Sequence, residues 1–216
     1  MIRWSDIDLV FLDLDGTLLD LAYDNYIWLA RVPEIYAERE GLSIAEAGAR
    51  LAPRFRAHMG TLNWYSLEFW SDELGIDLVA LHRAESHRIA WLPGARRFLE
   101  QMRERGKALV LLTNSHPITL EIKDAAAGIA GFFDAMYSSA RLGAPKESDL
   151  FWPNLQQQWP YRPERCFFAD DSLPVLEAAR RAGIAQTVQI SRPDSSRASN
   201  PAAHFKASER LVDLLD

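Results

Sequence analysis

The chain has 216 residues, of which 48% are hydrophobic, and it carries a formal net charge of −6 at pH 7. This length suffices for one domain, or for a core domain with an insertion, and the hydrophobic content suffices for a packed core. The acidic balance, without a long cluster of Lys and Arg, argues against a nucleic-acid-binding protein.

The sequence also lacks signals for membranes and secretion. Apolar runs such as residues 109–112 are far too short to span a membrane, and no basic segment followed by an apolar one marks a secretory leader. The one cysteine, Cys166, excludes an internal disulfide bond. It falls on an expected buried strand, which favours a packed thiol over a nucleophile. We expect a cytoplasmic protein that binds neither nucleic acid nor membranes.

The first expected strand, residues 7–12, ends in Asp13 and Asp15, followed by Gly16 and Thr17. Strand side chains alternate with a period of two, so both carboxylates emerge together where the strand ends. In open α/β sheets this end is where ligands bind. The two carboxylates repel each other unless a cation or a proton compensates them. The pair indicates a metal-dependent active site, although Asp-Gly alone is also a common turn pair.

Residues 18–91 contain no good strand candidate and show the amphipathic pattern of helices. Ser43 and Glu46 have the spacing of a capping box, and Pro33 and Pro53 are expected to bend their helices. Four helices are predicted here, over residues 23–40, 43–59, 63–74 and 77–89.

After Pro93 and Gly94 the pattern changes to alternating helices and strands. Such alternation implies a parallel sheet with helices on both faces. The predicted strands cover residues 108–112, 133–138, 165–169 and 187–190. The predicted helices cover residues 95–105, 117–127, 148–159, 172–182 and 207–215.

Three later segments carry polar residues at or after strand ends. Thr113 ends one strand, Lys146 follows Pro145, and Asp170 and Asp171 end another strand. Together with Asp-x-Asp-Gly-Thr at residues 13–17, these segments resemble the four motifs of the haloacid dehalogenase-like (HAD) hydrolases, in the order that the family requires.

The resemblance implies a two-part architecture. Residues 1–19 and 92–216 would form an α/β core, a Rossmann-like parallel sheet with helices on both faces. Residues 20–91 would form an all-helical C1 cap, inserted after the first strand and closing over the active site. A packing appendage is the alternative for this helical block.

The resemblance also implies roles for single residues. Asp13 would attack phosphorus and become a transient aspartyl-phosphate, while Asp15 would protonate the leaving oxygen and later deprotonate water. Thr113 and the adjacent Asn114 amide would bind a phosphoryl oxygen, and Lys146 would offset the repulsion between anions. For Thr113, a turn that closes the strand is the alternative.

The implied cofactor is Mg²⁺, which prefers oxygen ligands. Asp13, the backbone carbonyl of Asp15 and Asp171 would hold it. Asp170 stands where the family has Gly, and Val175 stands where the family has a further Asp, so Asp170 is a candidate for the missing outer-sphere carboxylate. The alternative for the pair at residues 170–171 is an N-cap of the helix that follows.

A closer resemblance concerns the substrate. Residues 13–21, 23–26, 61–65 and 112–117 look like the bacterial GMP/IMP nucleotidases of this superfamily. That resemblance implies Mg²⁺-dependent hydrolysis of purine 5′-nucleotides, small phosphomonoesters, to nucleosides and phosphate. Tyr26, Trp64 and Tyr65 are candidates for stacking on a base, and Asn25 or Asn63 for bonding its edge. The alternative, favoured for most of these aromatic residues, is that they form the core of the cap.

Other functions remain open at this stage. A sugar-phosphate phosphatase or a phosphomutase would share the four motifs and the cap. A non-enzymatic binding scaffold is disfavoured, because it need not retain the nucleophile, the second Asp, the lysine and the acidic pair. The histidines His58, His82, His87 and His116 show no metal-ligand spacing, and His116 is expected either at the pocket rim or in a loop.

Overall fold

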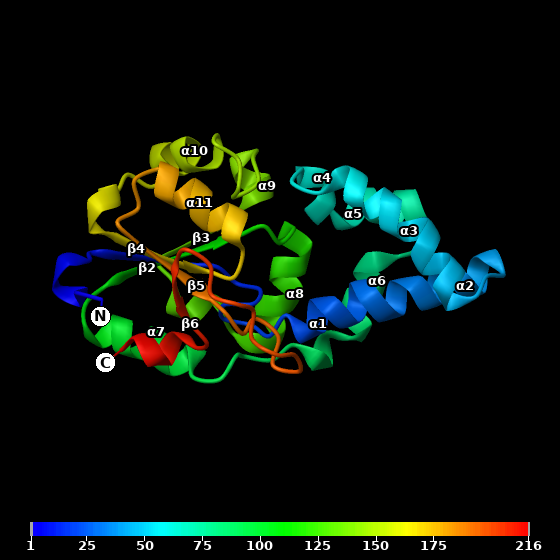
Figure 1. Cartoon of the computed structure of the whole chain (residues 1–216), viewed down its shortest axis with the longest axis horizontal. Helices are drawn as coiled ribbons and strands as arrows, with labels where there is room; N and C mark the ends of the chain where they lie inside the picture. Colours follow the sequence, from blue (N-terminus) through cyan, green and yellow to red (C-terminus); the bar gives the residue numbers. More distant parts are fainter. Residues whose placement is uncertain (1, 216) are drawn as a thin grey trace.

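The computed structural model describes residues 2–215 and shows an α/β core with a group of helices at one end (Figure 1). The core contains a six-stranded sheet in the order β3-β2-β1-β4-β5-β6, in which every neighbouring pair is parallel. The strands are β1 (Leu9–Leu12), β2 (Ala108–Thr113), β3 (Ala135–Ser138), β4 (Cys166–Asp170), β5 (Gln186–Ile190) and β6 (Lys206–Ser208). Because β1 lies between β2 and β4, the carboxyl ends of these three strands meet at one edge.

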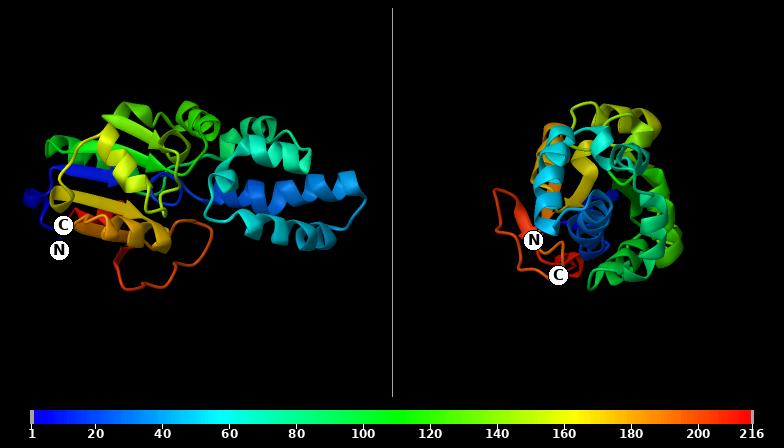
Figure 2. Two further views of the ribbon diagram at one scale, coloured as in Figure 1. Left: turned by 90° about the horizontal axis from the view of Figure 1, so that it is seen from above. Right: turned by 90° about the vertical axis from the view of Figure 1, so that its right-hand side faces the viewer.

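Helices cover both faces of the sheet, as the alternating pattern predicted (Figure 2). Along β1, Val10 and Leu12 pack into one hydrophobic layer, whereas Leu9 and Phe11 pack into the opposite one. The core helices are α7 (Ala95–Glu104), α8 (Pro117–Ala127), α9 (Ser139–Leu142), α10 (Phe151–Gln158) and α11 (Leu173–Arg181). Helix α7 covers the first layer, and α10 and α11 cover the second.

The segment between β1 and α7 is helical and has a hydrophobic cluster of its own. Its helices are α1 (Ala22–Tyr26), the π-helical η2 (Ile27–Arg31), α2 (Val32–Glu40), α3 (Ile44–His58), α4 (Leu62–Tyr65), α5 (Leu67–Leu74) and α6 (Leu78–Ala84). These helices lie at the right of Figure 1 and form the expected all-helical insertion. None of the helices described between residues 2 and 215 is both long and apolar enough to cross a membrane.

Local sequence signals explain two features of this insertion. Pro33 has no amide hydrogen, and in a regular helix its ring would clash with the carbonyl of Leu29. The chain widens into the π-helical turn η2 just before this proline. Ser43 and Glu46 form the predicted capping box at the start of α3.

The helix predicted over residues 63–74 is in fact two helices. Ser66 has an extended backbone between α4 and α5, and its hydroxyl accepts a hydrogen bond from the amide of Phe69 at 3.1 Å. Serine competes for such backbone groups and therefore favours N-caps over helix interiors. The helix predicted over residues 77–89 likewise stops early, because α6 ends at Ala84 and a 3₁₀ turn, Ser86–Arg88, follows.

The terminal helix predicted over residues 207–215 is wrong. This segment begins inside β6, which pairs with β5 through Val188 and Lys206, and ends in the 3₁₀ helix η6 (Leu211–Leu214). The amide of Ser191 continues this pairing by donating to the carbonyl of Ser208 at 2.8 Å. Pairing at the sheet edge therefore overrides the local helical pattern.

Gly94 provides a test of the packing between the start of α7 and η6. It starts α7 with a φ of +81°, and a Cβ there would collide with Cγ1 of Val212 and lie 2.7 Å from its Cβ. We expect Gly94→Ala to lower the free energy of unfolding by about 3 kcal/mol, because backbone strain and overpacking add. Denaturant titration followed by circular dichroism measures this loss.

Gly41→Ala is the matched control, because Gly41 has a φ of +66° but open space around a Cβ. It should cost only about 1 kcal/mol, the price of the backbone conformation alone. Equal losses in the two variants would contradict the packing explanation, and Val212→Ala should restore part of the stability of Gly94→Ala.

Candidate active site

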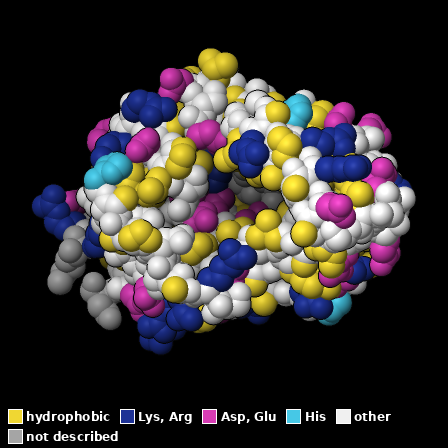
Figure 3. All heavy atoms as spheres, turned by 45° about the vertical axis from the view of Figure 1, so that its right-hand side comes forward, with side chains coloured by type: hydrophobic (Ala, Val, Ile, Leu, Met, Phe, Trp, Pro, Cys, Tyr) yellow, Lys and Arg dark blue, Asp and Glu magenta, His cyan; other side chains and the backbone are white. Residues whose placement is uncertain are grey.

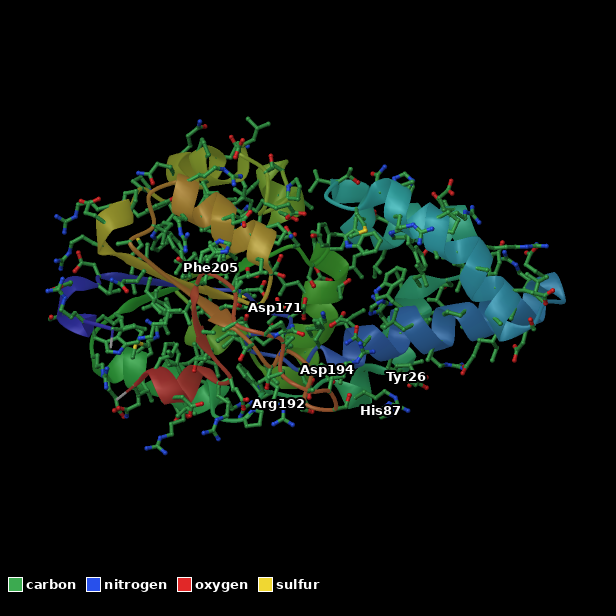
Figure 4. All side chains as sticks on the ribbon, in the orientation of Figure 1. Tyr26, His87, Asp171, Arg192, Asp194 and Phe205 are labelled. Carbon is green, nitrogen blue, oxygen red and sulfur yellow. The ribbon has the colours of Figure 1, made fainter. Side chains whose placement is uncertain are left out.

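Three carboxylates gather where β1 and β4 end. Oxygens of Asp13, Asp170 and Asp171 lie within 4.8 Å of one another, because Leu12 pairs with Ala169 in the parallel register and the aspartates follow directly. Lys146 reaches this cluster from the segment after α9, and its Nζ donates to Asp13 and, at 2.7 Å, to Asp170. Figure 4 shows Asp171 at the edge of the core that faces the helical insertion.

The cluster carries more negative charge than one lysine offsets. Burial raises the pKa of Asp13 to about 8, and Lys146 acts in the opposite direction. Burial also raises the pKa of Asp170 and Asp171. For Lys146, burial alone would lower the pKa, but the two carboxylates that it contacts raise it. An oxygen-rich set with uncompensated negative charge fits a hard divalent cation such as Mg²⁺.

Gly16 allows the loop after β1 to approach this cluster closely. A Cβ at this position would lie 2.9 Å from the carboxyl carbon of Asp171 and 2.8 Å from the Cβ of Pro193. Figure 3 shows a hollow between the core and the helical insertion, with acidic side chains at its floor. The site is therefore packed from behind and open towards the insertion.

The carboxylate of Asp15 lies outside the three-aspartate cluster. Its Oδ1 accepts a hydrogen bond from Lys123 Nζ at 2.5 Å, and its Oδ2 accepts one from the hydroxyl of Ser115 at 2.6 Å. With both oxygens bonded, the orientation of Asp15 is fixed from the α8 side. This arrangement leaves its backbone carbonyl, rather than its side chain, as the possible contribution to a cation site.

Lys123 is a residue that sequence reasoning missed. It is 1% exposed, and besides Asp15 it contacts Asp24 of α1 at 2.8 and 2.9 Å. Burial alone would lower the pKa of Lys123, but these two carboxylates raise it. One signal was available: Lys123 lies four residues from Thr119 and from Ala127, which are both on the buried face of α8.

Thr113 and Asn114 lie at the end of β2, beside Lys146. The hydroxyl of Thr113 accepts a hydrogen bond from the amide of Ser115 at 2.9 Å, which is the turn considered as its alternative role. The Asn114 side chain accepts from the Lys146 amide at 2.9 Å and donates to Glu147 at 3.0 Å. Its side chain thus holds the lysine loop in place.

Asp170 does not cap α11 in the usual way. Its Oδ1 accepts from the amide of Ser172 at 2.8 Å, but Ser172 is itself the N-cap residue of α11. Val175, which stands where the family has a further Asp, is buried in the core. The second oxygen of Asp170 faces Lys146, so Asp170 contributes its charge to the site.

A cavity of about 400 Å³ lies between the core and the insertion. Its walls are mostly aromatic and apolar, formed by Leu21, Asp24, Asn25, Trp28, Leu29, Phe55, Trp64, Tyr65, Leu67, Trp70, His82, Ser115, His116 and Thr119. Its volume lies within the range of small-molecule sites.

Some of the residues considered for base binding line this cavity, whereas others make contacts elsewhere. Trp64 and Tyr65 line it, and Trp64 also packs against the core of the insertion. Asn25 lines it too, but its amide donates to Asp194 at 2.7 Å. Tyr26 instead packs under the guanidinium of Arg88, 3.8 Å from the ring centre.

Comparison with known proteins agrees with this geometry. Residues 7–183 match the family model of the haloacid dehalogenase-like hydrolases. The chain is 38% identical to the GMP/IMP nucleotidase YrfG of Escherichia coli (strain K12) over 194 residues, which cover 90% of this chain and 87% of the relative.

Solved structures share the fold. A HAD phosphatase from Thermococcus onnurineus superposes with a TM-score of 0.79 at 21% identity, covering 96% of both chains. The L-2-haloacid dehalogenase from Xanthobacter autotrophicus superposes with a TM-score of 0.62 at 17% identity, again covering 96% of both chains. At these identities the likeness shows the fold alone.

Because Lys123 is bonded to two buried carboxylates, we expect its removal to lower the free energy of unfolding substantially. Lys123→Met leaves the carboxylates of Asp15 and Asp24 without their shared cation, and breaking such a buried pair costs about 3–5 kcal/mol. We expect this loss in denaturant unfolding at neutral pH, and partial recovery when Asp24→Asn is added.

Lys107→Met is the matched control, because within residues 2–215 Lys107 Nζ has a single hydrogen bond, to the carbonyl of Ile7 at 2.7 Å, and no carboxylate partner. It should cost about 1 kcal/mol, as expected for one hydrogen bond. If Lys123→Met were no more destabilised than this control, the buried network would not hold the insertion to the core.

Proposed function

The chain belongs to the haloacid dehalogenase-like hydrolases, and we propose that it is a Mg²⁺-dependent phosphomonoesterase that hydrolyses purine 5′-nucleotides such as GMP and IMP. The observation that carries this proposal is the continuity between the acidic centre and the aromatic cavity. Ser115 lines the cavity and donates to Asp15, so the cavity begins beside the acid/base. A phosphoester bound at the aspartates would extend its leaving group into this cavity.

In the proposed reaction, Asp13 attacks phosphorus and forms an aspartyl-phosphate, which divides the hydrolysis into two easier steps. Asp15 protonates the departing oxygen in the first step and takes a proton from the attacking water in the second. Lys123 and Ser115 support these transfers by fixing the Asp15 carboxylate.

The phosphoryl group would be held by the chain on two sides. Lys146 places positive charge beside the nucleophile. The Thr113 hydroxyl and the backbone amide of Asn114 would donate to phosphoryl oxygens. Asp13, the backbone carbonyl of Asp15 and Asp171 would bind Mg²⁺, with Asp170 outside them. When bound, the ion neutralises charge on the phosphoryl group and on the surrounding carboxylates.

The leaving group is inferred from the cavity and from the relative named as a GMP/IMP nucleotidase. Tryptophan-rich walls suit a planar base, because aromatic rings pack against each other in offset-stacked or edge-to-face arrangements. We also propose that residues 20–91 act as a cap on a core of residues 1–19 and 92–216, and that the cap excludes water during the reaction. The buried Cys166 thiol supports our proposal of a cytoplasmic location.

Asp13→Asn tests the covalent mechanism. The amide is a poor nucleophile, so phosphate release from GMP should fall by about four orders of magnitude or more, while circular dichroism shows an intact fold. Asp8→Asn is the control, because Asp8 lies just before β1 and pairs with Arg165 at the opposite end of the strand. It should retain nearly full activity; normal turnover by Asp13→Asn would exclude the aspartyl-phosphate.

A substrate panel tests the leaving group and the metal. We expect fast phosphate release from GMP and IMP with Mg²⁺, slow release from pyrimidine nucleotides and ribose 5-phosphate, and none with excess chelator. Release from sugar phosphates alone would keep the phosphatase chemistry and exclude the nucleotide assignment. No release from any substrate would contradict hydrolysis and favour a phosphomutase or a binding scaffold.

A further inference from the structure

His82 is a polar residue deep in the wall of the cavity. It lies on α6, is 1% exposed, and lines the same space as Trp28 and Trp70. Its Nδ1 lies 2.8 Å from the hydroxyl of Tyr23. Its Nε2 is buried but has no hydrogen-bond partner anywhere in residues 2–215. A buried polar atom without a partner is costly, so this nitrogen is suited to contact a ligand.

Tyr23 determines which nitrogen of His82 carries the proton. The Tyr23 hydroxyl lies 3.0 Å from the carbonyl oxygen of His82 as well as 2.8 Å from Nδ1. A carbonyl only accepts, and a hydroxyl has one hydrogen. All three atoms are satisfied when Tyr23 donates to the carbonyl and Nδ1–H donates to the Tyr23 oxygen. Nε2 then carries a lone pair without a partner, on a residue that lines the cavity.

The imidazole stays neutral at physiological pH. Burial lowers the pKa of His82 to about 4, and Lys123 acts in the same direction. The lone pair on Nε2 is therefore kept, and a ligand must supply an N–H or O–H to meet it.

We propose that Nε2 of His82 accepts the N1–H of a 6-oxopurine base stacked among the tryptophans of the cavity. This inference rests on the proposed function, since it names the group that selects the leaving group of that reaction. Guanine and hypoxanthine carry a hydrogen on N1, whereas adenine presents a lone pair there. His82 thus favours GMP and IMP over AMP, because two facing lone pairs repel.

The test uses nucleosides, so that it needs neither metal nor turnover. Inosine and 1-methylinosine differ at the N1 position, where a methyl group replaces the hydrogen. Trp28, Trp64 and Trp70 line the cavity, so quenching of tryptophan fluorescence reports binding. We expect the wild-type protein to bind inosine about tenfold more tightly than 1-methylinosine, the effect of one hydrogen bond.

His82→Phe separates the hydrogen bond from the size of the methyl group. Phenylalanine keeps a ring in the wall but removes the acceptor, so the preference for inosine should fall to about one. A preference retained in His82→Phe would come from steric exclusion and would overturn the proposal, as would equal binding of the two nucleosides by the wild-type protein.

Tyr23→Phe provides a second route that leaves His82 in place. Without the hydroxyl, Nδ1–H is no longer favoured, and the preference should drop severalfold. Tyr36→Phe is the control, because Tyr36 packs in the same hydrophobic cluster and is not among the residues that line the cavity; it should keep the wild-type preference. An unchanged preference in Tyr23→Phe would contradict the assigned proton position.

A failure of the His82 proposal can be distinguished from a failure of the proposed hydrolase function. If the protein releases phosphate from GMP but binds both nucleosides alike, the hydrolase proposal stands and the His82 contact is wrong. If it prefers inosine but releases no phosphate from GMP, the base contact stands and the hydrolase proposal fails.

Discussion

The contact of Lys146 with Asp13 and Asp170 is the interaction on which the site depends. Parallel pairing of β1 with β4 brings carboxylates together at one edge. Their repulsion is strong because they are buried, away from the screening of water. Lys146 offsets only part of that charge. The remaining negative charge suits a divalent cation, and that cation together with Lys146 would offset the charge of a phosphoryl group.

A second buried lysine, Lys123, also lies between two carboxylates, next to this site. Lys123 lies between Asp15 of the core and Asp24 of the insertion, where burial raises the pKa of Asp24 to about 6 while Lys123 opposes it. The carboxylate proposed to move protons is therefore held by a cation that also contacts α1. The geometry of the acid/base and the position of the helical insertion share one lysine, so neither is set independently of the other.

The sequence predicted the parts of this molecule that local chemistry determines. Buried strands ending in Asp13, Thr113 and Asp170 predicted the parallel sheet and its functional edge, because strand periodicity and strand ends are local properties. The terminal helix prediction failed because β6 forms by pairing with the edge of β5, a tertiary contact that the local pattern does not show. Lys123 was missed for a similar reason: its neighbours Asp15 and Asp24 meet it only in the folded chain.

Aromatic side chains of the helical insertion contribute both to its own core and to the wall of the cavity. Trp64 packs against Trp70 within the hydrophobic cluster of the insertion, and both also face the cavity. The cavity wall is thus the surface of a packed core, which restricts its rings to few rotamers. In this wall the buried Nε2 of His82 matters for selectivity, since a ligand that meets it gains a hydrogen bond and one that does not leaves it unpaired. The proposed selectivity would then come from a polar atom whose position is fixed by the aromatic packing around it.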